Sequence, residues 1–67
     1  MKQKEPVIQL DQFLKRMGLV STGGQAKIII QAGEVLLNGV VETRRKKKIK
    51  SGDEVTFQDE TYEVAFK

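Results

Sequence analysis

Apolar side chains recur with two different spacings along the 67 residues, and the change of spacing predicts two kinds of element. One helix is predicted from Leu10, because Leu10, Phe13, Leu14 and Met17 follow the i, i+3, i+4, i+7 pattern of a single buried stripe. A second helix is predicted after Thr22, with Gln25 reaching back to the N–H of Thr22 in a capping box and Gly33 as terminator. Only about four residues separate the two helices, which predicts an αα-hairpin.

Beyond Gly33 the spacing changes to two, which is typical of strands. Asn38-Gly39 is the strongest short signal for a hairpin turn, and it follows the alternating pair Val35 and Leu37. The fold class is therefore α+β, an αα-hairpin followed by a small, mostly antiparallel β-sheet whose apolar face covers the helices. Residues 1–8 are expected to form a flexible lead-in and residues 9–67 a single domain. The expected strands lie at 35–38, 40–43, 48–50, 55–57 and 62–66.

Composition excludes several kinds of chemistry. The chain has no Cys and no His, so it lacks thiolate metal ligands, disulfides and the commonest general base. A chain of 67 residues also offers little material for a cleft, so we expect neither an enzyme nor a cofactor, metal or small-molecule substrate. The longest apolar runs have three residues, as at Ile28–Ile30, and no apolar stretch follows the basic N-terminus. We therefore expect no membrane partner and a cytoplasmic location.

Charge is distributed unevenly along the chain. Residues 1–50 carry a net charge of +7 and residues 51–67 a net charge of −4, and half of the twelve Lys and Arg residues lie between 44 and 50. A positive region on a small body with a negative region elsewhere orients a polyanion, which suggests nucleic acid as the partner. A basic run can also be only a solvated loop.

The order of several short motifs resembles a known family. These motifs are Leu10-Asp11-x-x-Leu14, Gly18, Thr22-x-x-x-Ala26, Ile29-Ile30, Gly33-x-Val35-x-Leu37-Asn38-Gly39 and Ile49-x-x-Gly52-Asp53-x-Val55. Together they resemble the RNA-binding domain first described in ribosomal protein S-four, also called the αL motif. The segment 22–27 is similar to the small stand-alone bacterial members. The resemblance implies binding of structured RNA (ribosomal RNA, tRNA or a ribosomal subunit), with Thr22, Gln25, Lys27 and Asn38 as polar contacts.

The residues themselves suggest how such a surface would work. The first turn of the second helix offers free backbone N–H groups and the positive end of the helix dipole, which suit a phosphate. Gly23 and Gly24 let a sugar–phosphate backbone approach closely. We expect the basic run to lie on the same side of the molecule as this helix start. The candidate RNA-binding residues are Lys15, Arg16, Thr22, Gly23, Gly24, Gln25, Lys27, Asn38, Arg44, Arg45, Lys46, Lys47, Lys48 and Lys50.

Two positions depart from the family pattern. Gly23 stands where many members have Arg, and Gln9 stands where a basic residue is common. The hypothesis here is that the run 44–48 compensates as a flexible arm, and that the protein acts on ribosomal RNA or a ribosomal particle, in assembly or quality control.

Other interpretations remain open from the sequence. Gly23 and Gly24 could serve only a tight turn, and Asn38-Gly39 only a hairpin turn. A protein-interaction adaptor could dock a basic partner through the acidic C-terminal segment or a sheet edge. A duplex-DNA binder ranks lower, because no recognition helix with base-reading residues is evident.

Overall fold

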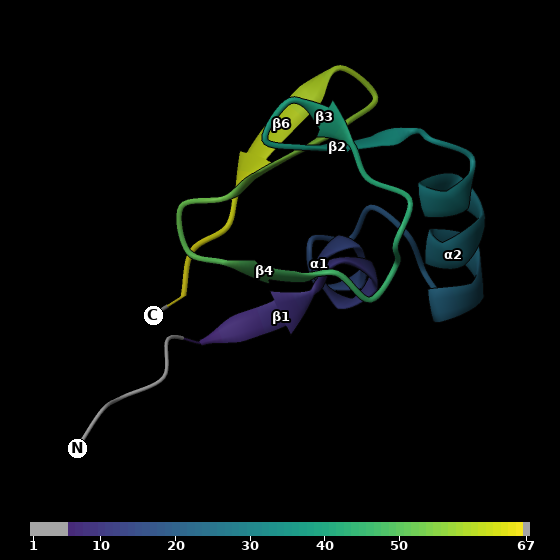
Figure 1. Cartoon of the computed structure of the whole chain (residues 1–67). Coiled ribbons are helices and arrows are strands. Elements are labelled where there is room, and N and C mark those ends of the chain that lie inside the picture. The colour runs from purple at the N-terminus through teal and green to yellow at the C-terminus, as the bar shows by residue number, and fades with distance from the viewer. Residues whose placement is uncertain (1–5, 67) are drawn as a thin grey trace.

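The computed structural model describes residues 6–66, and it confirms the α+β class and the αα-hairpin (Figure 1). The six strands form two antiparallel sheets, a two-stranded sheet β1-β4 and a four-stranded sheet in the order β3-β2-β5-β6. The elements are β1 Val7–Gln9, α1 Leu10–Arg16, α2 Gly23–Gln31, β2 Val35–Leu37, β3 Val40–Val41, β4 Lys48–Lys50, β5 Glu54–Phe57 and β6 Glu60–Glu63.

Both helices end where the sequence predicts. Gly18 and Gly33 follow α1 and α2 with φ of 77° and 81°, the left-handed conformation that glycine adopts at low cost. At the start of α2, Thr22 Oγ1 accepts a hydrogen bond from Gln25 N at 3.1 Å. The return bond differs by one residue from the capping box we expected, because Gln25 Oε1 accepts from Ser21 N at 2.9 Å rather than from Thr22 N.

The N-terminal strand β1 was not predicted. Its register places Ile8 opposite Ile49, and both side chains enter the core, at 7% and 0% exposure. The expected lead-in at 1–8 is therefore wrong for Val7 and Ile8, while residues 1–5 lie outside the described residues. Three residues are too few for an alternating pattern to be distinctive, and the strand forms only because β4 offers it a partner.

The core lies between the helices and one face of the four-stranded sheet. Leu10, Leu14 and Ile30 from the helices are fully buried, as are Val35 and Val55 from the sheet. The β2–β3 hairpin turns through Asn38 and Gly39, which have φ of 53° and 84°. Positive φ at both central residues is the mark of a type I′ turn, as the Asn-Gly pair predicts. The last strand is shorter than expected and ends at Glu63, although Val64 beyond it is buried.

Candidate nucleic-acid interface

The interhelical turn brings the end of α1 next to the start of α2. Lys15 and Arg16 form the last turn of α1, and both are exposed. Lys27 is exposed on α2, about one turn after its start. Residues 10–31 contain one carboxylate, Asp11, and only 7% of its surface is exposed. The solvent side of the two helices is therefore positive and carries no exposed acid.

Two glycines open α2, and the fold itself requires neither. Neither Gly23 nor Gly24 has a positive φ, so the backbone at both positions would accept an L-residue. A Cβ on Gly23 would meet no atom within 4 Å, and one on Gly24 would meet only Thr22 Oγ1 at 3.9 Å. Glycine in a helix costs up to about 1 kcal/mol relative to alanine. The interpretation that they serve only a tight turn is therefore not supported.

The basic run is held against the start of α1. Leu10 N donates to Lys47 O at 2.8 Å, and Asp11 N donates to Arg45 O at 2.9 Å. Gln9 caps the helix without a side-chain bond, so these loop carbonyls satisfy N–H groups that a helix start otherwise leaves free. Strand β4 then pairs Lys48–Lys50 with β1. The run is therefore not the flexible arm that we expected from its composition.

Cations within the run differ in their surroundings. Arg44 Nε lies 2.9 Å from Glu42, and Lys50 Nζ lies 3.4 Å from Asp53, so these two charges are partly compensated. The hydrogen bond from Arg44 is the main reason why the pKa of Glu42 is lowered. Among the described residues, no ion pair involves the other cations of the run. These unpaired cations are Arg45, Lys46, Lys47 and Lys48.

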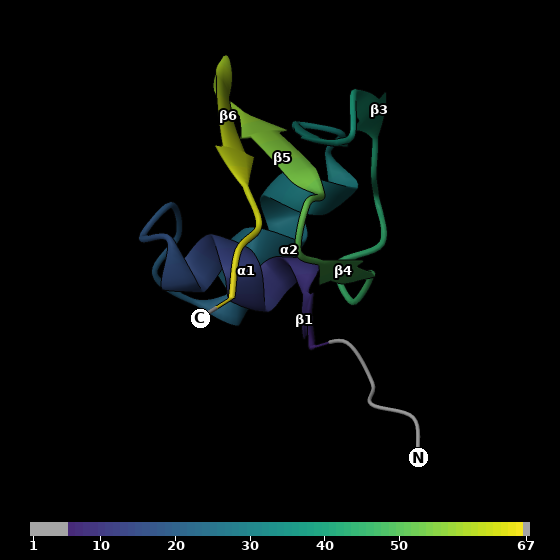
Figure 2. The same cartoon turned by 90° about the vertical axis from the view of Figure 1, so that its left-hand side faces the viewer.

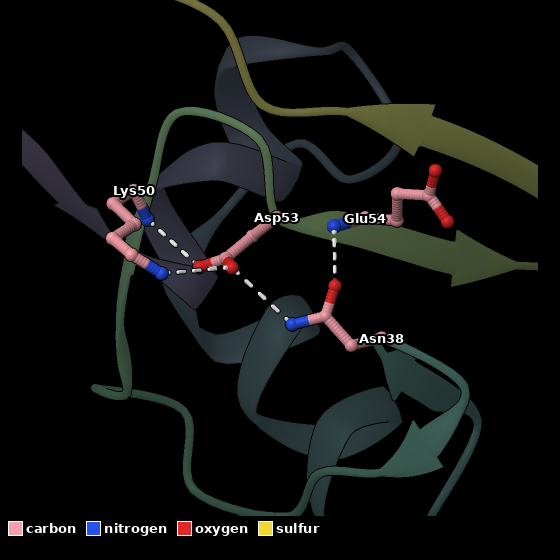
Figure 3. A network of polar contacts seen from close by, with 4 residues as sticks. All are labelled: Asn38, Lys50, Asp53 and Glu54. Carbon is pink, nitrogen blue, oxygen red and sulfur yellow. Dashed lines mark hydrogen bonds and ion pairs between the residues drawn. The ribbon is translucent and has the colours of Figure 1, made fainter.

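Asn38 belongs to a network of polar contacts at the protein surface (Figure 3). Its Nδ2 donates to Asp53 Oδ1 at 3.2 Å, and its Oδ1 accepts from Glu54 N at 2.9 Å. Lys50 N donates to Asp53 Oδ2 at 2.9 Å, and this bond is the main cause of a lowered Asp53 pKa. Because both ends of its amide are engaged, Asn38 joins two hairpins, which favours a structural role over a contact with RNA.

A polar groove of about 360 Å³ lies beside this network. Lysine side chains dominate its charged lining, with Lys47, Lys48 and Lys50 facing the compensating carboxylates Glu42 and Asp53. Sequence reasoning missed both carboxylates as parts of the site. The signal that could have found them is proximity, because Glu42 lies two residues from Arg44 and Asp53 lies three residues from Lys50.

The candidate residues form two clusters at opposite ends of α1 (Figure 2). One, the helix-turn cluster, consists of Lys15, Arg16, Lys27 and residues 22–25. The other, the basic-run cluster, consists of residues 44–48 with Lys50. The seven residues of α1 span about 10 Å, and Gln12 is exposed between the clusters. The expectation that the basic run and the start of α2 lie on the same side of the molecule stays a prediction, and the two clusters flank one helix.

Within residues 6–66, no group of three or more acidic residues lies together in a way that could hold a metal ion. The helices of this same segment are too short and too polar to cross a membrane.

Fold and surface together define a class, a small α+β domain with a helical hairpin and a cationic surface. The family model described as S4 domain matches residues 1–65, and the chain belongs to the S4 domain family.

Two relatives resemble most of the chain. YbcJ of Escherichia coli (strain K12) is 41% identical over 61 residues, covering 91% of this chain and 87% of that protein. RlbA of Bacillus subtilis (strain 168), named a probable ribosome maturation protein, is 38% identical over 52 residues, covering 78% and 73%.

Two solved structures share the fold. The solution structure of E. coli YbcJ, described as having an αL motif involved in RNA binding, matches with a TM-score of 0.68 at 38% identity over 97% of this chain and 82% of that one. Ribosomal protein S4e of Thermoplasma acidophilum matches with a TM-score of 0.71 at 19% identity, over 96% of this chain and 34% of that one. The second similarity concerns the fold alone.

Proposed function

We propose that this protein binds structured RNA without catalysing a reaction on it, and that its target is ribosomal RNA or a ribosomal particle during assembly or quality control. Phosphates would contact the basic-run cluster and the helix-turn cluster at the two ends of α1. The start of α2 would seat one phosphate on its free N–H groups.

The observation that carries this proposal is the cationic surface at the two ends of α1, where the described ion pairs engage only Arg44 and Lys50. Lys15 and Arg16 are exposed at one end of the helix, and backbone hydrogen bonds hold Arg45 and Lys47 at the other. Cations held in place can contact several phosphates of a folded RNA with little loss of conformational entropy. The αL motif involved in RNA binding, described for YbcJ, and the name of RlbA, a probable ribosome maturation protein, also support the proposal.

Aromatic side chains support folded rather than single-stranded RNA as the target. Phe13 and Phe57 are buried, and Tyr62 and Phe66 pack partly against the core. Single-strand binders use exposed aromatic rings on which bases stack. Recognition here would therefore depend on shape and phosphate position.

Equilibrium binding at about 150 mM salt tests the proposal, because electrostatic affinity depends on ionic strength. The purified protein is titrated into a ribosomal RNA fragment, a tRNA and a DNA duplex of equal length. We expect the RNAs to bind more tightly than the duplex DNA. Equal affinity for DNA would contradict the preference for RNA. Absence of binding to all three nucleic acids would favour the alternative function as a protein-interaction adaptor. Crosslinking in cells, followed by sequencing of the attached RNA, identifies the target.

A further inference from the structure

The outer face of the four-stranded sheet carries a row of side chains that the core does not use. The strand register places Val41, Leu36, Thr56 and Thr61 side by side across β3, β2, β5 and β6. Their neighbours along the strands, Val35 and Val55, point into the core and are fully buried. Val41 is 52% exposed, and α1 and β4 lie below this sheet in Figures 1 and 2.

A largely apolar groove of about 390 Å³ lies on this face. Leu36 of β2 supplies the apolar side chain on this face, directly opposite Thr56 of β5, and the next residue of β5, Phe57, borders the groove although only 7% of it is exposed. The lining also includes the carboxylates Glu34 and Asp59 and no basic residue. The groove therefore suits an apolar side chain that is flanked by positive charge.

Two further carboxylates lie next to the row. Glu54 and Glu63 are direct partners across β5 and β6, and both are exposed. Like charges directly opposite each other destabilise a sheet. Among residues 6–66 neither forms an ion pair, and the four strands contain no Lys or Arg. A cation placed between these carboxylates would remove the repulsion.

We propose that this outer face is a second docking surface, which binds an extended Lys/Arg-rich segment of a partner protein. An apolar residue of the segment occupies the groove, and a neighbouring cation lies between Glu54 and Glu63. Charge complementarity selects this occupant, because a polyanion is repelled from the face. The surface is separate from the cationic surface around α1, so RNA and a basic protein segment can be held at the same time.

Chemical-shift mapping tests the proposal directly. The ¹⁵N-labelled chain is titrated with a short synthetic peptide in which one leucine is flanked on both sides by lysine and arginine, and with a control peptide in which glutamate replaces each basic residue. We expect the basic peptide alone to shift the amides of Leu36, Val41, Thr56 and Thr61. The titrations contain no RNA, so their outcome does not depend on whether the RNA proposal is right.

A matched pair of variants tests which face of the sheet binds the peptide. Glu63→Gln should raise the dissociation constant of the peptide by about twofold to fivefold, the range expected for one exposed ion pair. Glu60→Gln removes the same charge from the same strand but on the other face, and should leave the constant unchanged. Equal effects of the two variants, shifts centred on α1, or no binding up to millimolar peptide would overturn the proposal. Shifts of the same amides that depend on protein concentration in the absence of peptide would also overturn the proposal, because they would show that a second copy of the chain occupies the face.

Discussion

Asn38 and Asp53 are joined through their side chains at 3.2 Å, although fifteen positions separate them in the sequence. The bond ties the tip of the β2–β3 hairpin to the turn that precedes β5 (Figure 3). Asp53 in turn holds Lys50, the last residue of β4, through its backbone N–H and its ammonium group. One carboxylate thus connects the two sheets and sets where the end of the basic run lies.

Two substitutions of Asn38 separate its structural roles, which are side-chain hydrogen bonding and a left-handed backbone conformation. Asn38→Gly keeps the left-handed backbone but loses both side-chain bonds, and should lower the free energy of unfolding by about 1 kcal/mol. Asn38→Ala should cost about 1 kcal/mol more, because its φ of 53° is unfavourable for alanine. Urea unfolding measures both changes. RNA affinity of Asn38→Gly should equal that of the wild type, and a tenfold weaker complex would return Asn38 to the interface.

Asp53 should also make stability depend on pH. Its pKa is lowered from the ordinary value of 3.8, first by the hydrogen bond from Lys50 N. Its contribution is therefore complete above the unfolded pKa and is lost as the pH falls through the folded one. The pKa of Glu42 is also lowered, so Glu42 adds a further loss of stability as the pH falls.

Urea unfolding between about pH 3 and pH 6 checks this dependence. Asp53→Asn should be less stable than the wild type at neutral pH, and its stability should fall less steeply in the acid range. Parallel curves for the two proteins would show that Asp53 does not titrate as described.

Gly24→Ala should make the protein more stable and bind RNA less well. Because its backbone is helical and a Cβ has room, the change should raise the free energy of unfolding by up to about 1 kcal/mol. The added methyl group would keep an RNA backbone away from the start of α2. Gly33→Ala is the control: its φ of 81° predicts a loss of about 1 kcal/mol without loss of RNA affinity. Undiminished affinity in Gly24→Ala would mean that no close approach occurs there.

Removing three cations should reduce the salt dependence of RNA binding. Changing Lys46, Lys47 and Lys48 together to Ala should flatten the slope of log K against log salt by roughly 2 to 3, since each phosphate contact contributes about 0.7 to 0.9. The bonds that anchor the run use the backbone of Arg45 and Lys47, so the fold should persist. Circular dichroism verifies the fold, and an unchanged slope would rule out the run as a phosphate-binding segment.

Much of the fold follows from local patterns. The stripe that begins with Leu10, Phe13 and Leu14 placed α1, although its predicted fourth member, Met17, is 43% exposed. Thr22 with Gln25 placed the start of α2. Asn38-Gly39 placed a type I′ hairpin, because few residue pairs accept positive φ at both positions. Each of these signals depends on residues within about one helical turn or one tight turn of each other, which a sequence shows directly.

Sequence alone also determined the family and the presence of a strong positive charge between residues 44 and 50. Only the tertiary structure decided where that charge lies, because Asp11 N and Arg45 O meet through the path of the chain. It likewise paired Ile8 with Ile49 and engaged Asn38 with Asp53. Such contacts join residues far apart in sequence, and their geometry depends on how the whole core packs rather than on any local pattern of side chains.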